Sequence, residues 1–246
     1  MLGNKTLREY LLSSKQKLVK RANTFLFLCE SIFKCCLRIL SKTMKRTTRN
    51  AAKTKQEIIE KSAPLFNIHG YEGTKMQMIV EATGYQMGGI YRHFGTKKAL
   101  AQEAFRYNYQ LLKNSYVQGM HEGQSPKEQL LQLLQNLQTT FFTSTVVGGC
   151  PILNTAIEAD DTDSDFRALA SEGLDELVGI VEKILEEGKK GGDFKPGIQP
   201  TQEALYLMTT VEGLIMVAKL KRSGKVLKAV FERFTVYIKD NVLNNK

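Results

Sequence analysis

Residues 73–100 read GTKMQMIVEATGYQMGGIYRHFGTKKAL. Their apolar spacing predicts one short helix that ends near Thr83 and a second helix over about residues 86–91. Gly84 separates the two, and Gly95 precedes a third, longer helix. Two short helices joined at a glycine are typical of the helix-turn-helix, whose second helix enters the major groove of DNA. This stretch therefore predicts a DNA-binding module.

The order of particular residues within the stretch adds to this pattern. The spacing of Gly84, Gly88, Tyr91, Phe94 and Lys97 resembles that of the TetR (tetracycline repressor) family of bacterial regulators. The resemblance is specific over about residues 54–105 and weak beyond them. It implies an all-α chain, with an N-terminal three-helix DNA-binding module that contains the helix-turn-helix. A helical domain that binds an effector and pairs two subunits would follow the module.

The expected DNA contacts combine the resemblance with the chemistry of the side chains. The resemblance assigns phosphate contacts to Tyr91 and His93, and Lys97 lies in a first helical turn, which favours anions. Glutamine can pair with adenine and methionine can pack on a thymine methyl, so Gln86 and Met87 are candidates for base recognition. The expected DNA-contacting residues are Thr74, Lys75, Gln86, Met87, Gly88, Gly89, Tyr91, Arg92, His93 and Lys97.

Each of these residues also has a purely structural interpretation. Tyr91 and Phe94 are alternatively aromatic residues of the module's core, and His93 is alternatively a solvated surface residue. The lysines at 97 and 98 are alternatively an ordinary solvated helix end.

Charge and composition restrict the classes of function. The net charge of +10 falls within residues 1–50, and the remaining residues carry 23 basic and 23 acidic side chains. A local basic patch must therefore supply any attraction to DNA. The chain lacks the short motifs of zinc proteases, α/β-hydrolases, phosphate-binding loops and dinucleotide sites. The acidic run at 160–165 lacks the glycine and distal glutamate of a calcium loop. We expect no enzyme activity, cofactor or metal.

The N-terminal segment, residues 1–43, is a separate basic amphipathic stretch. Glu30, Lys34 and Arg38 interrupt its apolar run, which argues against a transmembrane span. We interpret it as a non-native or accessory extension, with Met44 as the natural start. The alternative is a membrane-surface helical binding protein that uses residues 15–42. The chain has four cysteines, and none of them forms a Cys-x-x-Cys pair, which fits a reducing, cytoplasmic location.

The remainder of the chain shows helical patterns throughout. Ser125-Pro126-Lys127-Glu128 carries a capping serine, a proline and a glutamate in the order that starts a helix. Further helices are predicted over about residues 151–158, 165–188, 201–220 and 225–242. We predict three regions: an N-terminal extension at 1–43, a helix-turn-helix DNA-binding domain at 44–98, and an effector-binding and dimerisation domain at 99–246.

The last two helices are the candidates for a dimer interface. Their apolar faces could form a four-helix interface with two-fold symmetry, which implies a near-palindromic operator. The alternative is that these faces only fill the core of the same chain. The faces comprise Leu205, Met208, Val211, Leu214, Ile215 and Ala218 in the first helix, and Val230, Phe231, Phe234, Tyr237, Ile238 and Val242 in the second.

The effector site is expected in a largely apolar pocket of the second domain. Asn154 and Glu158, four residues apart on a predicted helix, could give it a polar anchor. Cys150 stands at a predicted helix start, where a reactive thiolate and a buried structural cysteine are both allowed. The expected ligand-binding residues are Tyr109, Leu112, Tyr116, Phe141, Phe142, Cys150, Ile152, Asn154, Glu158, Met208 and Glu212. Together these features predict a dimeric repressor that a small, largely apolar ligand releases from DNA.

Overall fold

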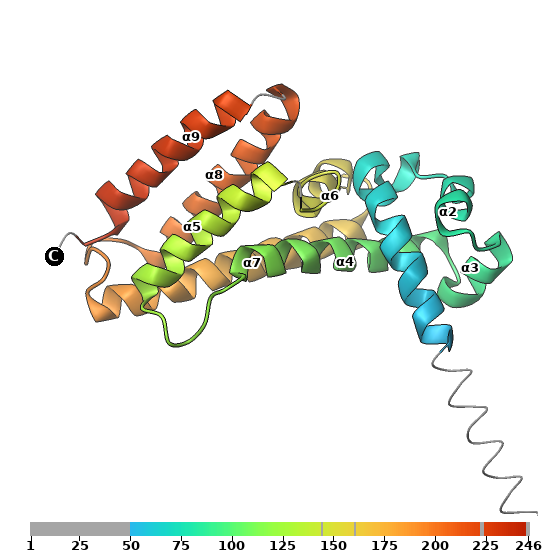
Figure 1. The fold of residues 1–246 in the computed structure, drawn as a ribbon, viewed down its shortest axis with the longest axis horizontal. Helices are drawn as coiled ribbons and strands as arrows, with labels where there is room; N and C mark the ends of the chain where they lie inside the picture. The colour runs from blue at the N-terminus through green and yellow to red at the C-terminus, as the bar shows by residue number, and fades with distance from the viewer. Residues whose placement is uncertain (1–49, 144, 160, 222–223, 245–246) are drawn as a thin grey trace, which may run out of the picture. The chain divides into compact units, whose positions relative to one another are not determined.

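The computed structural model describes residues 50–244, except for residues 144, 160, 222 and 223. The chain divides into a unit of residues 1–55 and a unit of residues 56–246. Of the first unit, only residues 50–55 are described, and they are helical. The predicted amphipathic segment and Met44 lie outside the described residues. The second unit contains every element discussed below (Figure 1).

The second unit begins with a helix at residues 56–73, here called the first helix. Gly70 has a φ of 74°, and residues 71–73 form a further turn beyond it. The first helix therefore continues to residue 73, past the positive φ of Gly70. Buried Ser62 satisfies its hydroxyl locally by donating to the Ile58 carbonyl oxygen, at 2.7 Å.

Helices α2 (Met76–Thr83) and α3 (Met87–Phe94) form the predicted helix-turn-helix. Gly84 has a φ of 77°, and its amide donates to the Val80 carbonyl oxygen, which ends α2. A left-handed conformation of this kind is readily adopted by glycine. Lys75 occupies the cap position before α2, and its side chain makes no capping hydrogen bond. Thr74 is fully buried, and its hydroxyl donates to the Gly70 carbonyl oxygen at 2.6 Å.

Helix α4 (Lys97–Val117) starts where predicted. Thr96 caps it by accepting a hydrogen bond from the Ala99 amide at 3.0 Å, which satisfies one of the unpaired amides at a helix start. One apolar core joins the first helix, α2, α3 and the beginning of α4. Its buried residues include Ile58, Ile59, Ala63, Phe66, Ile79, Ile90, Leu100, Ala101 and Ala104. Ile90 is the buried residue of α3, and its side chain packs into this core.

The helices after α4 are α5 (Pro126–Thr143), α6 (Pro151–Ala159) and α7 (Ser164–Gly191). The predicted capping pattern before α5 is confirmed: the Glu128 carboxylate accepts from the Ser125 amide at 2.8 Å, and the Glu128 amide donates to the Ser125 hydroxyl. Asp163 caps α7 by accepting from the amides of Asp165 and Phe166. The acidic run before α7 is thus explained as a helix start.

Helices α8 (Pro200–Lys221) and α9 (Gly224–Tyr237) follow, and a short π-helical turn at Ile238–Val242 ends the fold. Helix α7 packs against α5, α6 and α8, and α8 packs against α9 (Figure 1). A single large apolar core lies between α4, α5, α7, α8 and α9. The described residues contain no strand, only an isolated bridge between Phe194 and Leu243. The all-α prediction is confirmed.

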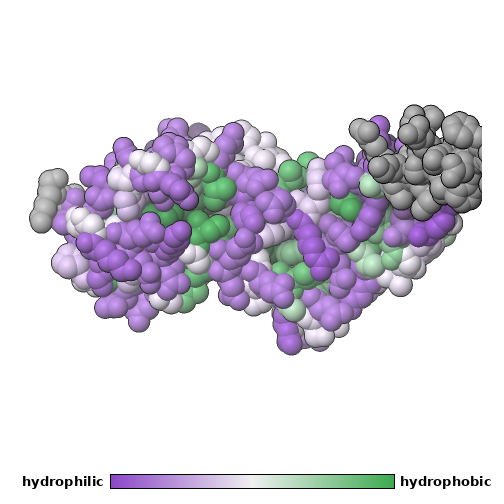
Figure 2. All heavy atoms as spheres, turned by 90° about the horizontal axis from the view of Figure 1, so that it is seen from below, coloured by the Kyte–Doolittle hydropathy of each residue, from purple (hydrophilic) through white to green (hydrophobic). Residues whose placement is uncertain are grey.

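The apolar faces of α8 and α9 differ from the expectation. Most of the predicted interface residues fill the core of the same chain, including Met208, Val211, Phe231 and Phe234. The exposed apolar side chains of these helices form a set that shares only Leu205 and Val230 with the predicted faces. It comprises Leu205, Tyr206, Met216, Leu220, Val230 and Val236. Figure 2 shows one face of the molecule, where a mostly hydrophilic surface is interrupted by patches of apolar side chains.

Within the described part of the chain, none of the helices has both the length and the apolar character that crossing a membrane requires.

Candidate DNA-binding surface and ligand cavities

The outward side of α3 is the candidate DNA-binding surface. Ile90 faces inward and is 1% exposed, whereas Met87 and Tyr91 are exposed at the solvent side of the same helix. A Cβ added at Gly88 or Gly89 would meet nothing within 4 Å. Because these two residues have no side chains, another molecule can approach the α3 backbone closely at this point. Gln86, at the start of α3, and Arg92, near its end, are also exposed.

Basic residues flank this surface. Lys75 is exposed immediately before α2. Lys97 is half-buried at the start of α4, and its ammonium lies 4.4 Å from the centroid of the Tyr71 ring. Lys98 is differently placed, because it forms ion pairs of 2.8 Å with both Asp163 and Asp165. Of the adjacent lysines, Lys97 is therefore the better candidate for a phosphate contact.

Two further predicted contact residues are buried or half-buried. Buried Thr74 uses its hydroxyl within the module, which corrects its assignment as a phosphate contact. His93 is half-buried, with its ring 6.4 Å from the Phe94 ring. Phe94 packs against the module's core, in agreement with its structural interpretation.

A cavity of about 410 Å³ lies in the helical body, between α4, α5, α8 and the loop before α6. Four predicted ligand-binding residues, including Tyr116 and Cys150, line it. Its wall also includes residues that the sequence did not mark, among them Lys219 and the glycines of the loop. The lining residues are Leu112, Tyr116, Thr140, Phe141, Val146, Gly148, Gly149, Cys150, Ile215, Ala218 and Lys219.

Other predicted ligand-binding residues do not line this cavity. Tyr109, Ile152 and Met208 belong to the apolar core. The Tyr109 hydroxyl donates to the Glu176 carboxylate on α7, and burial together with this bond raises the pKa of Tyr109. The side chain of Phe142 lies outside the described side chains.

A buried polar group adjoins the cavity at Cys150. The Cys150 thiol, 2% exposed, donates to the Glu212 carboxylate at 3.2 Å. Burial and the Glu212 charge raise the pKa of Cys150 well above its ordinary value, and burial raises the pKa of Glu212. A neutral thiol is favoured, so the structure supports the structural interpretation of this cysteine over a reactive thiolate. Glu212 contacts Cys150 but does not line the cavity that it was expected to line.

A polar junction connects this cavity to the first helix. The Lys219 ammonium donates to the Gly148 carbonyl oxygen and to Asn154 Oδ1, at 2.9 and 2.6 Å. Asn154 Nδ2 in turn donates to the backbone oxygen and the side-chain oxygen of Asn67, both at 3.0 Å. Asn67 Nδ2 donates to the carbonyl oxygens of Val147 and Gly149. Asn154 thus serves this junction rather than the cavity that it was expected to line.

The junction also brings backbones into close contact. Gly148 has a φ of 92°, and a Cβ at this position would lie 2.9 Å from the Asn67 carbonyl oxygen. Both the conformation and the space therefore require glycine. The loop at 147–149, which forms one wall of the cavity, therefore packs directly against the first helix.

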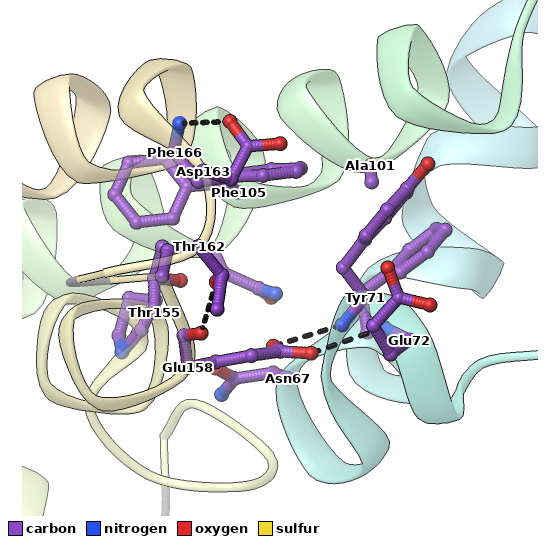
Figure 3. A pocket seen from close by; sticks show the side chains of 14 residues that line it. Asn67, Tyr71, Glu72, Ala101, Phe105, Thr155, Glu158, Thr162, Asp163 and Phe166 are labelled. Atoms are coloured by element: carbon purple, nitrogen blue, oxygen red, sulfur yellow. Dashed lines mark hydrogen bonds between the residues drawn. The ribbon is translucent and has the colours of Figure 1, made fainter.

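Glu158 makes a second connection to the first helix. Its carboxylate accepts from the Tyr71 and Glu72 amides, at 2.9 and 3.0 Å. A Cβ at Gly70 would approach the Glu158 carboxylate to 2.5 Å. Glu158 borders a smaller cavity of about 270 Å³, formed by the first helix, α4, α6 and the start of α7 (Figure 3). It is the only predicted ligand-binding residue in that wall among the residues described.

Among the described residues, no three histidine, cysteine, aspartate or glutamate side chains gather as a metal site.

Comparison with known proteins gives two family matches. Residues 58–104 match the model described as bacterial regulatory proteins of the tetR family. Residues 126–234 match that of the tetracyclin repressor-like C-terminal domain. The two matches cover the helix-turn-helix with its supporting helices, and most of α5 to α9.

Solved structures agree with these matches. A TetR transcriptional regulator from Chloroflexus aurantiacus J-10-FL is 32% identical, with a TM-score of 0.74, over 79% of this chain and 98% of that one. A TetR-family regulator from Cytophaga hutchinsonii is 31% identical, with a TM-score of 0.71, over 80% and 98%. The transcriptional repressor DhaR of Mycobacterium sp. strain GP1 is 24% identical over 72% of this chain and 90% of its own length. The chain therefore belongs to the TetR family of DNA-binding transcriptional regulators, as its glycine-hinged helix pair indicates.

Proposed function

We propose that this protein is a dimeric repressor that leaves a near-palindromic operator when a small, largely apolar ligand enters the 410 Å³ cavity. The observation that carries the proposal is the polar junction, which ties the wall of that cavity to the first helix. We also propose that the protein acts in the cytoplasm.

The DNA half of the proposal rests on α3. Helix α3 is anchored inward by buried Ile90 and by Phe94. It exposes Met87, Tyr91 and Arg92 on its outer side, which suits it to the major groove. Gln86, Met87 and Arg92 are the candidates for base contacts, because they are exposed along that helix and its start. Lys75, Tyr91, His93, Lys97 and the backbone at Gly88–Gly89 would position the helix on phosphates.

Dimerisation is supported by the exposed apolar side chains of α8 and α9. Leu220 is 76% exposed, and Tyr206 is 50% exposed beside the Tyr237 ring, 4.9 Å between centroids. Apolar patches on a soluble protein commonly mark interaction sites. In the proposed dimer the two α3 helices would have to lie about 34–36 Å apart, one turn of DNA.

Ligand control would proceed through the loop at 148–149. A ligand against this loop and Lys219 competes for space with the hydrogen bonds that hold Asn154 and Asn67 together. A ligand that prefers a different position of the first helix shifts the population away from the DNA-bound form. A coupling free energy of about 1–3 kcal/mol is sufficient for such a response.

Selection of bound sequences from a pool of random duplexes tests the DNA-binding proposal. We expect enrichment of a two-fold symmetric site, bound by two chains. Enrichment of no sequence, or binding by a single chain, would overturn the dimeric repressor.

A cavity-filling variant tests the ligand proposal. Ala218→Phe places a ring in the cavity, so we expect normal operator binding with loss of release by any inducer found in a screen of apolar compounds. Ala168→Phe, on the exposed side of α7, is the matched control. An inducer that acts equally on both variants would show that its site lies elsewhere.

A further inference from the structure

The smaller cavity of about 270 Å³ lies where the DNA-binding module meets the helical body. Its walls come from the first helix and α4 on one side, and from α6 and the start of α7 on the other (Figure 3). It is separate from the larger cavity, with which it shares no lining residue. Its volume is below the roughly 300–1,000 Å³ of sites for drug-sized ligands, which restricts it to a compact molecule.

Aromatic rings supply much of the apolar wall. Phe66, Tyr71, Phe105 and Phe166 all line the cavity. The Tyr71 and Phe166 rings are tilted against each other, with centroids 5.2 Å apart. The negative face of such rings attracts organic cations. Two lysines outside the wall already make cation–π contacts with these rings. The Lys97 ammonium lies 4.4 Å from the Tyr71 centroid, and the Lys98 ammonium lies 5.9 Å from the Phe166 centroid.

The charged groups of the wall are all acidic. Glu72, Glu158 and Asp163 line the cavity, and its described wall contains no lysine, arginine or histidine. Asp163 is paired with Lys98, which lowers the pKa of Asp163, and Glu158 accepts two backbone amides. Glu72 is exposed at the edge of the cavity, beside Tyr71 (Figure 3). Lys98 compensates the charge of Asp163, so the carboxylates of Glu72 and Glu158 are the ones that a cation in this aromatic cavity would meet.

We propose that this cavity is a second ligand site, which binds a compact organic cation such as a primary arylalkylamine. The ammonium group would lie near Glu72 and Glu158, and the apolar part would lie among the rings of Phe66, Phe105 and Phe166. Because the walls belong to both the DNA-binding module and the helical body, such a ligand stabilises the contact between them.

Calorimetric titration with two probes of equal size tests the proposal. 2-Phenylethylamine is a cation at neutral pH, whereas 2-phenylethanol is neutral. We expect the amine to bind once per chain and about tenfold more tightly than the alcohol, a difference of roughly 1.4 kcal/mol. Equal binding of the two probes, or no binding of the amine, would overturn the proposal.

Substitutions locate the bound amine. Glu72→Gln removes one carboxylate at an exposed position and is expected to weaken amine binding several-fold, while binding of the alcohol stays unchanged. Thr155→Phe adds a ring within the cavity and is expected to abolish binding of the amine. Glu172→Gln, at an exposed position on α7, is the matched control. Unchanged amine affinity in both cavity variants would refute the site.

The larger cavity provides the last control. Ala218→Phe fills that cavity and is expected to leave amine binding intact. Loss of amine binding in this variant, with retention in Thr155→Phe, would place the amine in the larger cavity and contradict the proposal. Because none of these titrations involves DNA, failure of this second site leaves the repressor proposal standing, and the reverse also holds.

Discussion

Asn154 on α6 donates its side-chain amide to both oxygens of Asn67 on the first helix, at 3.0 Å each. Asn67 is 8% exposed, so these bonds lie in a protected part of the molecule. Because Asn67 also donates to the loop at 147–149, one pair of asparagines joins the first helix, α6 and the cavity wall.

Removing this pair is expected to weaken both stability and the response to ligand. Asn154→Ala leaves buried acceptors of Asn67 without a donor, which costs about 1–3 kcal/mol of unfolding free energy. Urea denaturation measures this loss, and operator titration with inducer measures the coupling. Gln110→Ala, which removes a bond only to Asn114 on the same exposed face of α4, is the control and is expected to change neither.

Gly70→Ala is expected to destabilise the protein by about 1–3 kcal/mol, the usual cost of a strained backbone conformation. The positive φ of 74° opposes a side chain, and the new methyl group would displace the Glu158 carboxylate. Thermal unfolding of the variant provides the measurement. Gly179→Ala in α7 makes the matched comparison: its Cβ meets open space, and we expect it to stabilise by roughly 0.5–1 kcal/mol. Equal effects of the two substitutions would contradict this account.

Lys97→Ala is expected to weaken binding to all duplex sequences to a similar degree. Loss of one phosphate contact lowers the slope of log affinity against log salt by about 0.9. Fluorescence anisotropy at several salt concentrations measures both quantities. Lys183→Ala, on the exposed part of α7, should leave the slope unchanged. An unaltered slope for Lys97→Ala would remove this residue from the proposed interface.

Gln86→Ala is expected to act differently, by relaxing the preference at a single base pair of each half-site. A side chain that pairs with one base contributes about 1–3 kcal/mol of discrimination. Selection of bound duplexes with the variant and the parent chain measures the preference at each position. A variant that loses affinity evenly at all positions would indicate that Gln86 only positions the module.

The buried carboxyl of Glu212 is expected to make the stability of the protein depend on pH. Burial raises its pKa above 4.5, so the folded state binds this proton more tightly than the unfolded state. The stabilisation from this protonated carboxyl is therefore fully present below pH 4.5, and it is lost as the pH rises through the raised pKa of Glu212. Glu212→Gln removes this titration, and urea denaturation between pH 4 and pH 8 should show a smaller loss of stability with rising pH than in the parent chain. Identical pH profiles would rule out this role.

The sequence predicted the local elements well, because their signals are local. Gly84 ends α2 through its own backbone conformation, and Ser125 with Glu128 starts α5 through bonds between near neighbours. The junction could not be predicted, since Asn67 and Asn154 are 87 residues apart and no local pattern indicates that they meet.

Periodicity identified buried side chains of the body without indicating which of them border a cavity. Tyr109 and Tyr116 are seven residues apart on the same face of α4, and both are buried. The Tyr109 hydroxyl reaches the exposed Glu176 carboxylate on α7, whereas Tyr116 borders the larger cavity. Only the packing of α7 and α8 separates these two outcomes, and the spacing along α4 does not contain that information.

The contact between Gly148 and Asn67 also limits how this protein could be converted into a biosensor for a new compound. A side chain at position 148 would collide with the Asn67 backbone, so we expect substitutions there to disturb the contact between the loop and the first helix. Thr140 and Phe141 on α5, with Ile215 and Ala218 on α8, border the same cavity away from that contact. Diversity introduced at these four positions can alter which compound is sensed while the link to the operator-binding helices is kept.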